Sequence, residues 1–266
     1  MRSPKKSFRF IFLFLVVFAG FAAWRIFGSN TNFTEAKKSF YIKTGSNFND
    51  VIEQLEEQQI LKNPGTFKLI AQQIKYDENI KAGKFIIDNG SSIFKVAKIL
   101  KSGKQTPVNL VITKLRTKED FAQKIASNFE CDSASIMALL NNNDSLKNYG
   151  LDSNTAMTAI IPNTYAILWN TSPSRLFKKL YNEQGKFWTE ERRKKAAGRN
   201  LSIREAYTLA SIVEEETNKQ DDKGKVASTY INRLQKGMKL EADPTVKYAM
   251  RNFGLKRILY GHLQYE

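Results

Sequence analysis

The sequence contains one cysteine and one histidine, Cys131 and His262. A single cysteine cannot form an intrachain disulfide, so packed cores have to stabilise the fold. One cysteine and one histidine also leave too few ligands for an ordinary zinc site. We therefore expect no metal and no cofactor, and chemistry that side chains perform alone.

Long apolar runs are missing except near the N-terminus. The uncharged run Phe10 to Trp24 follows the basic residues Arg2, Lys5, Lys6 and Arg9. It reaches the roughly 17–20 residues that a bilayer requires if it extends to Phe27 with Arg25 at the interface. A basic leader stays cytoplasmic. We predict a leader and transmembrane anchor over residues 1–28, a single pass through the cell (inner) membrane, with the bulk of the chain outside the cytoplasm. The alternative is a signal peptide cleaved near Gly20-Phe21-Ala22.

Positive charge exceeds negative charge over the chain as a whole. The formal net charge is +16, and +11 remains without the five positive charges up to Arg25. In the cytoplasm this excess would suggest nucleic acid. Outside the cytoplasm, an anionic membrane surface or cell-wall polymer is the better match, so we expect no nucleic acid partner. The basic run from Arg192 to Lys195 is interpreted as a solvated helix face.

Short strands and helices alternate after the anchor. Residues 29–38 are polar and unpatterned, which predicts a stalk. The elements expected next are a strand at 40–42, a helix capped by Asn47, a helix opened by Asn63-Pro64, a strand at 84–87, a helix capped by Ser91 or Ser92 that ends at Gly103, and a strand at 108–112. We therefore predict an α+β fold, with a small α+β module over 39–105 and a mixed α/β domain over 106–266.

An acidic cluster ends one amphipathic helical pattern. Ser202-x-x-Glu205 is a capping box that starts the helix, and three glutamates follow an apolar face. At 100° per residue, Glu215 lies opposite that face and is expected to be solvated. Glu214 falls within the face and Glu216 on its flank, and periodicity does not choose between them. The alternative is that both are rim carboxylates paired with lysine or arginine.

A carboxyl group beside an apolar face keeps its proton to higher pH, because desolvation and like charges disfavour its ionised form. Such a group can act as a general acid near neutral pH. The cluster therefore indicates acid–base chemistry.

The residues downstream add candidates for a site. Asp222 or Asp221 is expected to cap a helix that carries Asn232 and Arg233, whose side chains could donate hydrogen bonds to a sugar. Asp243-Pro244 has the form of an N-cap followed by proline at the first helical position. Asp243 therefore has a structural interpretation and a substrate-binding interpretation, and the two remain open.

Several motifs in this order resemble a known family. The blocks are Ala82-Gly83-Lys84-Phe85, Leu100-x-x-Gly103, Pro162-Asn163-Thr164-Tyr165, Ala210 to Thr217, Lys225-Val226-Ala227-Ser228, Ile231-Asn232-Arg233-Leu234, Gly237-Met238 and Asp243-Pro244-Thr245-Val246. They resemble the endolytic murein transglycosylases, the MltG or YceG-like family. The resemblance implies that the module over 39–105 is LysM-like and that 106–266 is the catalytic domain.

The resemblance implies roles for particular residues. The catalytic glutamate of the family stands immediately before threonine, which is Glu216 here, with Glu214 as the second candidate. Support or substrate binding is implied for Asn232, Arg233, Asp243, Thr245 and Tyr165, although an aromatic residue after a turn, such as Tyr165 or Trp169, is also typical of a core.

The chain departs from the family at two places. Met157-Thr158 stands where the family often has Glu-Gly. The family also continues beyond Glu266, so we expect the catalytic domain to be incomplete at its C-terminus.

The implied function is cleavage of MurNAc–GlcNAc bonds in nascent peptidoglycan strands without water, leaving 1,6-anhydro ends that terminate elongation. Glu216 would protonate the glycosidic oxygen and then accept a proton from the sugar's C6 hydroxyl. The expected partners are peptidoglycan glycan strands, the membrane and cell-wall synthases. Two alternatives stay open, a non-catalytic peptidoglycan-binding scaffold and a hydrolase that uses water with a distant base such as Asp243.

Overall fold

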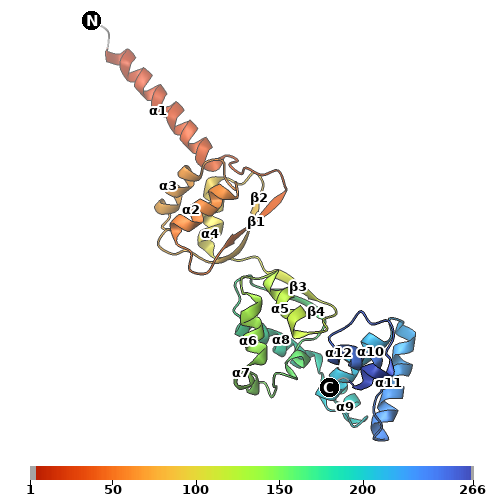
Figure 1. Ribbon diagram of the computed structural model, residues 1–266. Coiled ribbons are helices and arrows are strands. Elements are labelled where there is room, and N and C mark those ends of the chain that lie inside the picture. The colour runs from red at the N-terminus through yellow and green to blue at the C-terminus, as the bar shows by residue number, and fades with distance from the viewer. Residues whose placement is uncertain (1–3, 265–266) are drawn as a thin grey trace. The chain divides into compact units, whose positions relative to one another are not determined.

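The computed structural model describes residues 4–264, and the chain in it forms two compact units (Figure 1). The first unit comprises Met1–Leu110 with two short later segments, Ser127–Cys131 and Tyr165–Thr171. The second unit comprises Val111–Ala126, Asp132–Thr164 and Ser172–Glu266. Helices and strands both occur, which confirms the α+β class.

Helix α1, Pro4–Phe27, forms from the apolar run near the N-terminus. Within residues 4–264 it is the one helix that is long and apolar enough to cross a membrane, over Phe10–Phe27. A signal sequence meets the same criterion, so the anchor stays a prediction. The guanidinium of Arg25, which is expected at the interface, donates a hydrogen bond to the Asn63 side chain.

The rest of the first unit is a β-hairpin covered by three helices. Strand β1 (Lys37–Ile42) pairs antiparallel with β2 (Gly83–Asp88), placing Phe40 opposite Phe85. Helices α2 (Phe48–Glu57) and α3 (Pro64–Gln73) lie between these strands in sequence, and α4 (Ile93–Ser102) follows them.

The predicted start and stop signals of these helices act as expected. The Asn47 side chain caps α2 within a capping box, and the Ser92 side chain accepts from the Lys95 N–H at the start of α4. Gly103 ends α4 with φ of 66°, a left-handed conformation that glycine adopts without steric cost.

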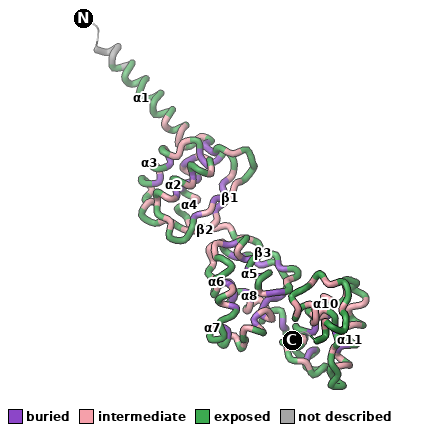
Figure 2. Tube along the Cα trace, viewed as in Figure 1, coloured by how far each residue is buried: buried purple, intermediate pink, exposed green. Residues whose placement is uncertain are grey.

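A dense apolar core joins the hairpin to its helices, and Figure 2 shows the buried residues in purple. Alternate residues of β1 and β2 point into it, as the two-residue period of a strand requires. The fully buried side chains include Phe40, Ile42, Val51, Leu55, Phe67, Phe85, Ile87, Ile93 and Leu100.

Residues 29–38 are not a free stalk. Asn30 and Thr31 are buried, and the backbone of Asn30 exchanges hydrogen bonds with Ser91 and Lys62 at 3.0 and 2.7 Å. Strand β1 also begins at Lys37 rather than at residue 40. The sequence predicts a stalk here because hydrogen bonds to distant backbone groups leave no periodic pattern in the sequence.

The second unit is mostly helical within the residues that the structure describes, rather than mixed α/β. Strands β3 (Val108–Ile112) and β4 (Asn163–Ile167) form a two-stranded sheet at the points where the chain passes between the units. The helices are α5 (Lys118–Ala126), α6 (Ser133–Asn141), α7 (Asn143–Lys147), α8 (Pro173–Phe187), α9 (Glu190–Ala197), α10 (Ile203–Glu216), α11 (Gln220–Gln235) and α12 (Asp243–Ala249), with short 3-10 turns η1 (Ala156–Ala159) and η2 (Tyr260–Gln264).

Two predicted helix caps are wrong. Lys219 stands at the N-cap of α11, and Asp221 and Asp222 lie in its first turn, where negative charge is favourable beside the helix dipole. Asp243 is the first helical residue of α12 rather than its cap, because the buried Ala242 occupies the cap position.

Candidate active site

Helix α10 carries the acidic cluster and begins at the predicted capping box. The Ser202 hydroxyl accepts from the Glu205 N–H, and the Glu205 carboxylate accepts from the Ser202 N–H. The apolar face of α10 buries Leu209 and Val213 against α11 and α12. The helix therefore ends with its three glutamates close to the α10–α11 contact.

Glu215 is less exposed than Glu214 and Glu216, which contradicts its predicted solvation. Its carboxylate is bound by Lys114 at 2.9 Å and by the Arg116 guanidinium through Nε at 3.1 Å and Nη2 at 3.1 Å. Its side chain is 25% exposed, against 51% for Glu214. On the side of α10 away from its apolar face, Glu215 contacts Arg116, which lies 99 positions earlier in the sequence. Helical periodicity cannot reveal such a distant partner.

The surroundings of Glu215 keep it ionised. Partial burial pushes its pKa upward, but hydrogen bonds and charge from Arg116 and Lys114 outweigh burial, so the pKa lies below the ordinary value of 4.5. An anion held in this way is suited to fixing α10 in place and unsuited to donating a proton near neutral pH.

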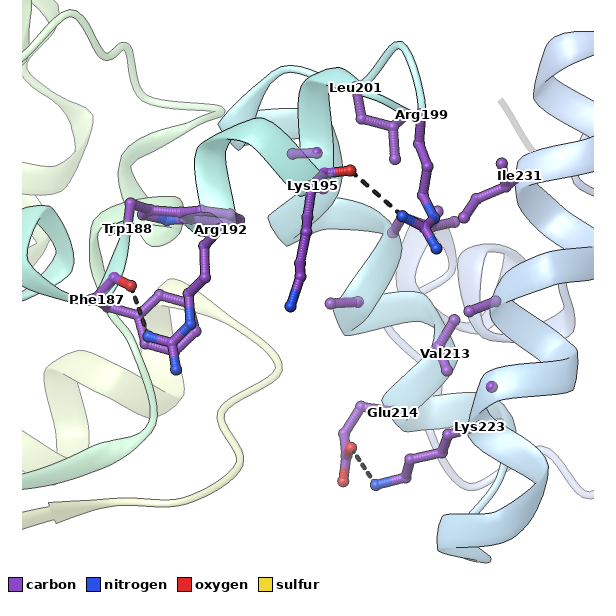
Figure 3. A pocket seen from close by; sticks show the side chains of 16 residues that line it. Phe187, Trp188, Arg192, Lys195, Arg199, Leu201, Val213, Glu214, Lys223 and Ile231 are labelled. Atoms are coloured by element: carbon purple, nitrogen blue, oxygen red, sulfur yellow. Dashed lines mark hydrogen bonds and ion pairs between the residues drawn. The ribbon is translucent and has the colours of Figure 1, made fainter. Parts of the chain in front are cut away.

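Glu214 does not lie within the apolar face as the helical pattern predicted. It is exposed and forms an ion pair with Lys223 of α11, drawn at the lower right of Figure 3. This arrangement matches the alternative interpretation of a rim carboxylate paired with lysine.

Glu216 makes a different contact. It is the last residue of α10 and is exposed, so the apolar surroundings expected for a general acid are not provided by this part of the chain. Its carboxylate lies close enough to Tyr230, a buried residue of α11, to raise the pKa of that hydroxyl through charge and hydrogen bonding. Asp243, at the start of α12, is close enough to act electrostatically on the same hydroxyl.

Tyr230 is the site residue that sequence reasoning missed. Burial raises its pKa to about 12, and the charge of Glu216, the hydrogen bond to Glu216 and the charge of Asp243 act in the same direction. The phenol therefore stays protonated at neutral pH. Its only sequence signal is one hydroxyl among the apolar positions of α11, which predicts a core tyrosine equally well.

A cavity of about 550 Å³ lies beside the cluster, between α9, α10 and α11 (Figure 3). Its floor is apolar, with Leu209, Val213 and Ile231, and its edge carries Arg192 and Lys223. Glu214 lines this cavity and Glu216 does not. The two candidate glutamates therefore face different surroundings, as a spacing of two residues on a helix requires.

The remaining predicted residues are only partly brought together. The guanidinium of Arg233 is engaged by the Lys239 carbonyl at 2.8 Å and by Glu241, so it supports the turn after α11. The Thr245 hydroxyl donates to the Ala242 carbonyl at 2.7 Å, and Asn232 is exposed. Tyr165 is buried on β4 and belongs to the first unit, in agreement with the core interpretation.

No group of three or more histidine, cysteine, aspartate or glutamate side chains suited to a metal occurs within residues 4–264. The end of α10 offers three groups for acid–base chemistry, which are the exposed carboxyl group of Glu216, the Tyr230 hydroxyl on which it acts, and the carboxyl group of Asp243, whose charge acts on the same hydroxyl.

Comparison with known proteins relates the chain to one family. A sequence model described as the YceG-like family matches residues 40–266. A Bacillus subtilis (strain 168) protein named endolytic murein transglycosylase is 42% identical over 64 residues, which cover 24% of this chain and 18% of that protein. A Streptococcus pneumoniae (serotype 2, strain D39) protein of the same name is 24% identical over 248 residues, covering 80% of this chain and 43% of that protein. The chain thus spans less than half the length of these relatives.

The fold also has a counterpart among solved structures. A crystal structure of a YceG-like protein from Listeria monocytogenes aligns with a TM-score of 0.54 and 22% identity, covering 87% of this chain and 81% of that one. At this identity the likeness concerns the fold alone.

Proposed function

The chain belongs to the YceG-like family, and from that premise we propose that it is a membrane-anchored endolytic lytic transglycosylase of peptidoglycan. Two relatives that match it carry the name endolytic murein transglycosylase. One observation supports the proposal above the others. The glutamate implied to be catalytic, Glu216, is the one that acts on the hydroxyl of a buried tyrosine, Tyr230, whereas its neighbours are engaged by lysine and arginine.

The reaction proposed is cleavage of a MurNAc–GlcNAc bond with formation of a 1,6-anhydro ring. Glu216 in its protonated form donates to the glycosidic oxygen as positive charge develops on the sugar. The resulting carboxylate then removes the proton of the C6 hydroxyl, which closes the ring. One carboxyl group serves both steps because the nucleophile is part of the substrate.

Tyr230 positions Glu216 in this scheme. A hydrogen bond from the Tyr230 hydroxyl to one carboxylate oxygen would restrict rotation of the Glu216 side chain and leave the other oxygen available for the sugar. Since Glu216 is exposed, we propose that the glycan itself covers it and removes the water that surrounds it in the free protein.

Asp243 supports a second candidate function, hydrolysis. Its charge acts on the same tyrosine hydroxyl as Glu216, so two carboxyl groups lie near one point. A glycoside hydrolase needs such a pair, with one group acting on the bond and the other activating water or forming a covalent intermediate. The products distinguish the two reactions, since only the transglycosylase leaves anhydro ends.

Membrane attachment through α1 belongs to the same proposal. Its apolar span over Phe10–Phe27 would hold the remainder of the chain at the outer face of the cell membrane. Cutting would then be directed to newly made strands near the synthases, and the excess of positive charge suits an anionic polymer.

The test is digestion of purified peptidoglycan by the full chain in detergent, with the products identified by mass spectrometry. We expect 1,6-anhydroMurNAc ends, and a loss of about 10²-fold or more in rate for Glu216→Gln. Glu214→Gln is the matched control, because it makes the same chemical change two residues away, and it should retain most of the rate.

Reducing ends in place of anhydro ends would select the hydrolase. Absence of any cleavage would favour a peptidoglycan-binding scaffold, and normal turnover by Glu216→Gln would remove the assignment of Glu216.

A further inference from the structure

Helix α9 presents a basic face to the cavity that lies between α9, α10 and α11 (Figure 3). The run Arg192 to Lys195 is exposed, as expected of a solvated face, but the helix divides it. Arg193 and Lys194 do not line the cavity and have partners of their own. Residues three, four and seven positions apart share one side of a helix. On α9 and the turn after it, that side lines the cavity with Arg192, Lys195, Ala196 and Arg199.

Two of these cations have no acidic partner. Lys195 pairs with Glu191 at 2.6 Å, but the guanidiniums of Arg192 and Arg199 form no ion pair within the described part of the chain. Arg192 donates one N–H to the Phe187 carbonyl at 2.6 Å, and Arg199 donates one to the Lys195 carbonyl at 3.4 Å. Since a guanidinium has five N–H donors, both side chains can still bind a carboxylate through two hydrogen bonds.

Small residues leave room between the helices. Helix α10 contributes Ala206 and Ala210, which are one turn apart, and α11 contributes Gly224 and Ala227. The volume of about 550 Å³ is within the range of small-ligand sites, roughly 300–1,000 Å³. Among the lining residues, Glu214 is the one carboxylate, and Lys223 neutralises it. The cavity is therefore suited to a ligand with small apolar groups and more than one acidic group.

The cavity is close to the candidate catalytic group along α10. Val213 and Glu214 line it, and Glu216 follows within one helical turn, roughly 3–5 Å further along the axis. A group bound in the cavity can therefore belong to the same substrate as a sugar that contacts Glu216.

We propose that this cavity binds an acidic peptide with small side chains, namely the stem peptide that peptidoglycan carries on MurNAc. Carboxylates of the peptide would pair with Arg192 and Arg199, and its alanine methyl groups would pack on the apolar floor. A phospholipid fits less well, because it brings one phosphate to two guanidiniums that are seven positions apart. The inference rests on the proposed function and deepens it, since it assigns a preference for strands that carry peptides over bare glycan.

The first experiment measures binding of the tetrapeptide L-Ala-γ-D-Glu-L-Lys-D-Ala to the full-length Glu216→Gln chain in neutral detergent by isothermal titration calorimetry. In that background, Arg192→Gln and Arg199→Gln should each weaken binding by about tenfold or more. Arg199→Lys should restore part of the affinity, because it keeps the charge but not the paired donors. Arg204→Gln is the matched control and should bind normally. Arg204 is an exposed arginine of α10 that also donates to a backbone carbonyl, and it is not among the cavity residues.

A second pair of variants fills the cavity instead of removing charge. A Cβ added at Gly224 would meet nothing within 4 Å, so Gly224→Leu should place apolar bulk there without a clash and exclude the peptide. Gly185→Leu in α8 is the control, because its added Cβ also meets nothing within 4 Å but Gly185 lies outside the cavity. Both variants replace a helical glycine, so neither melting temperature should fall. Loss of binding in Gly224→Leu alone therefore reports on the ligand rather than on folding.

The second experiment compares cleavage of intact peptidoglycan with cleavage of the same strands after an amidase has removed their peptides. Arg199→Gln in the otherwise unaltered chain should lose about tenfold in kcat/KM on intact strands and nothing on bare strands. A residue needed only for folding would lower both rates.

Unchanged peptide affinity in Arg192→Gln and Arg199→Gln would overturn the proposal, as would equal losses of cleavage on the two substrates. Binding of short-chain phosphatidylglycerol in place of the peptide would overturn it in favour of a lipid. If the unaltered chain cleaves neither substrate, the proposed function fails, and the calorimetry still decides whether the cavity binds the peptide, because it is measured without turnover.

Discussion

The first unit and the helices around the candidate site are stabilised in different ways. In the first unit, the core from Phe40 to Leu100 consists of side chains that are almost entirely buried. Around the candidate site, the corresponding cluster contains four buried residues, Leu209, Val213, Tyr230 and Ala242. The helices of the site depend more on polar contacts, such as Arg116 with Glu215 and Tyr207 with the Ile160 carbonyl.

This difference shows how one chain can combine a stable module with an adaptable site. Apolar burial contributes about 25 cal/mol per Å² whatever the pH, whereas partly exposed ion pairs contribute little and respond to pH and salt. A helix held by directed polar contacts can place a carboxyl group accurately without burying it. The comparison leads to four predictions.

The largest expected effect is on the core of the first unit. Phe85→Ala removes a fully buried ring opposite Phe40 and should lower the free energy of unfolding by about 3–5 kcal/mol. Leu209→Ala, its counterpart in α10, should cost about 2 kcal/mol, because fewer neighbours surround it. Denaturant unfolding combined with hydrogen exchange of peptides from β1 and α10 measures each unit separately. Equal costs would mean that the two units are packed alike.

The second prediction concerns activity rather than stability. Tyr230→Phe removes the hydroxyl on which Glu216 acts and should lower the rate of glycan cleavage by about tenfold. Because the ring remains, the melting temperature should change little. Tyr248→Phe, on the exposed Tyr248 of α12, is the control and should cleave normally. A loss confined to KM would contradict a role for Tyr230 in positioning the acid.

The third prediction is a dependence on pH at the ion pair that holds α10. The pKa of Glu215 is lower in the folded chain, so its stabilising contribution is present above the ordinary value of 4.5 and is lost as the pH falls through the folded value. Glu215→Gln should cost about 1 kcal/mol at pH 7, after allowance for solvent screening, and nothing under strongly acidic conditions. Hydrogen exchange of α10 at several pH values tests this difference. A pH-independent cost would remove the ion pair as the cause.

The smallest effect is expected at a neutral hydrogen bond. The Tyr207 hydroxyl donates to the Ile160 carbonyl at 2.8 Å and so joins α10 to the loop before β4. Tyr207→Phe should destabilise the second unit by about 0.5–1 kcal/mol at every pH, in contrast to Glu215→Gln. Thermal unfolding at pH 4 and pH 7 gives the comparison, and a pH-dependent loss would mean that Tyr207 acts through a charged group.

Local signals in the sequence were enough to predict much of the first unit. Asn47, Ser92 and Gly103 mark helix ends because capping depends on hydrogen bonds within four residues. Strand β3 has the bounds that its apolar pattern predicted, and β2 is one residue longer at each end. The prediction was wrong for the segment around Asn30, because the backbone hydrogen bonds of Asn30 reach residues 32 and 61 positions away.

The candidate site was less predictable from the sequence, because its side chains also contact residues outside their own helix. The helical pattern located α10 and its capping box correctly, but it placed Glu215 in solvent and Glu214 in the apolar face. Both errors arise from partners outside the helix, Arg116 and Lys114 in one case and Lys223 in the other. The choice of Glu216 came from a family resemblance, and its role as the catalytic group stays a prediction.

The junction between α1 and the hairpin has a consequence for where this protein can work. The Arg25 side chain is hydrogen-bonded to Asn63, and the ring centres of Phe27 and Phe94 are 5.5 Å apart. The backbone of Asn30 forms hydrogen bonds with Ser91 and Lys62. With these contacts, the connection between α1 and the hairpin is a fixed one and not a flexible linker. If α1 spans a bilayer, as proposed, the hairpin would lie at a fixed distance from the lipid surface. Only glycan strands at that distance could then reach it.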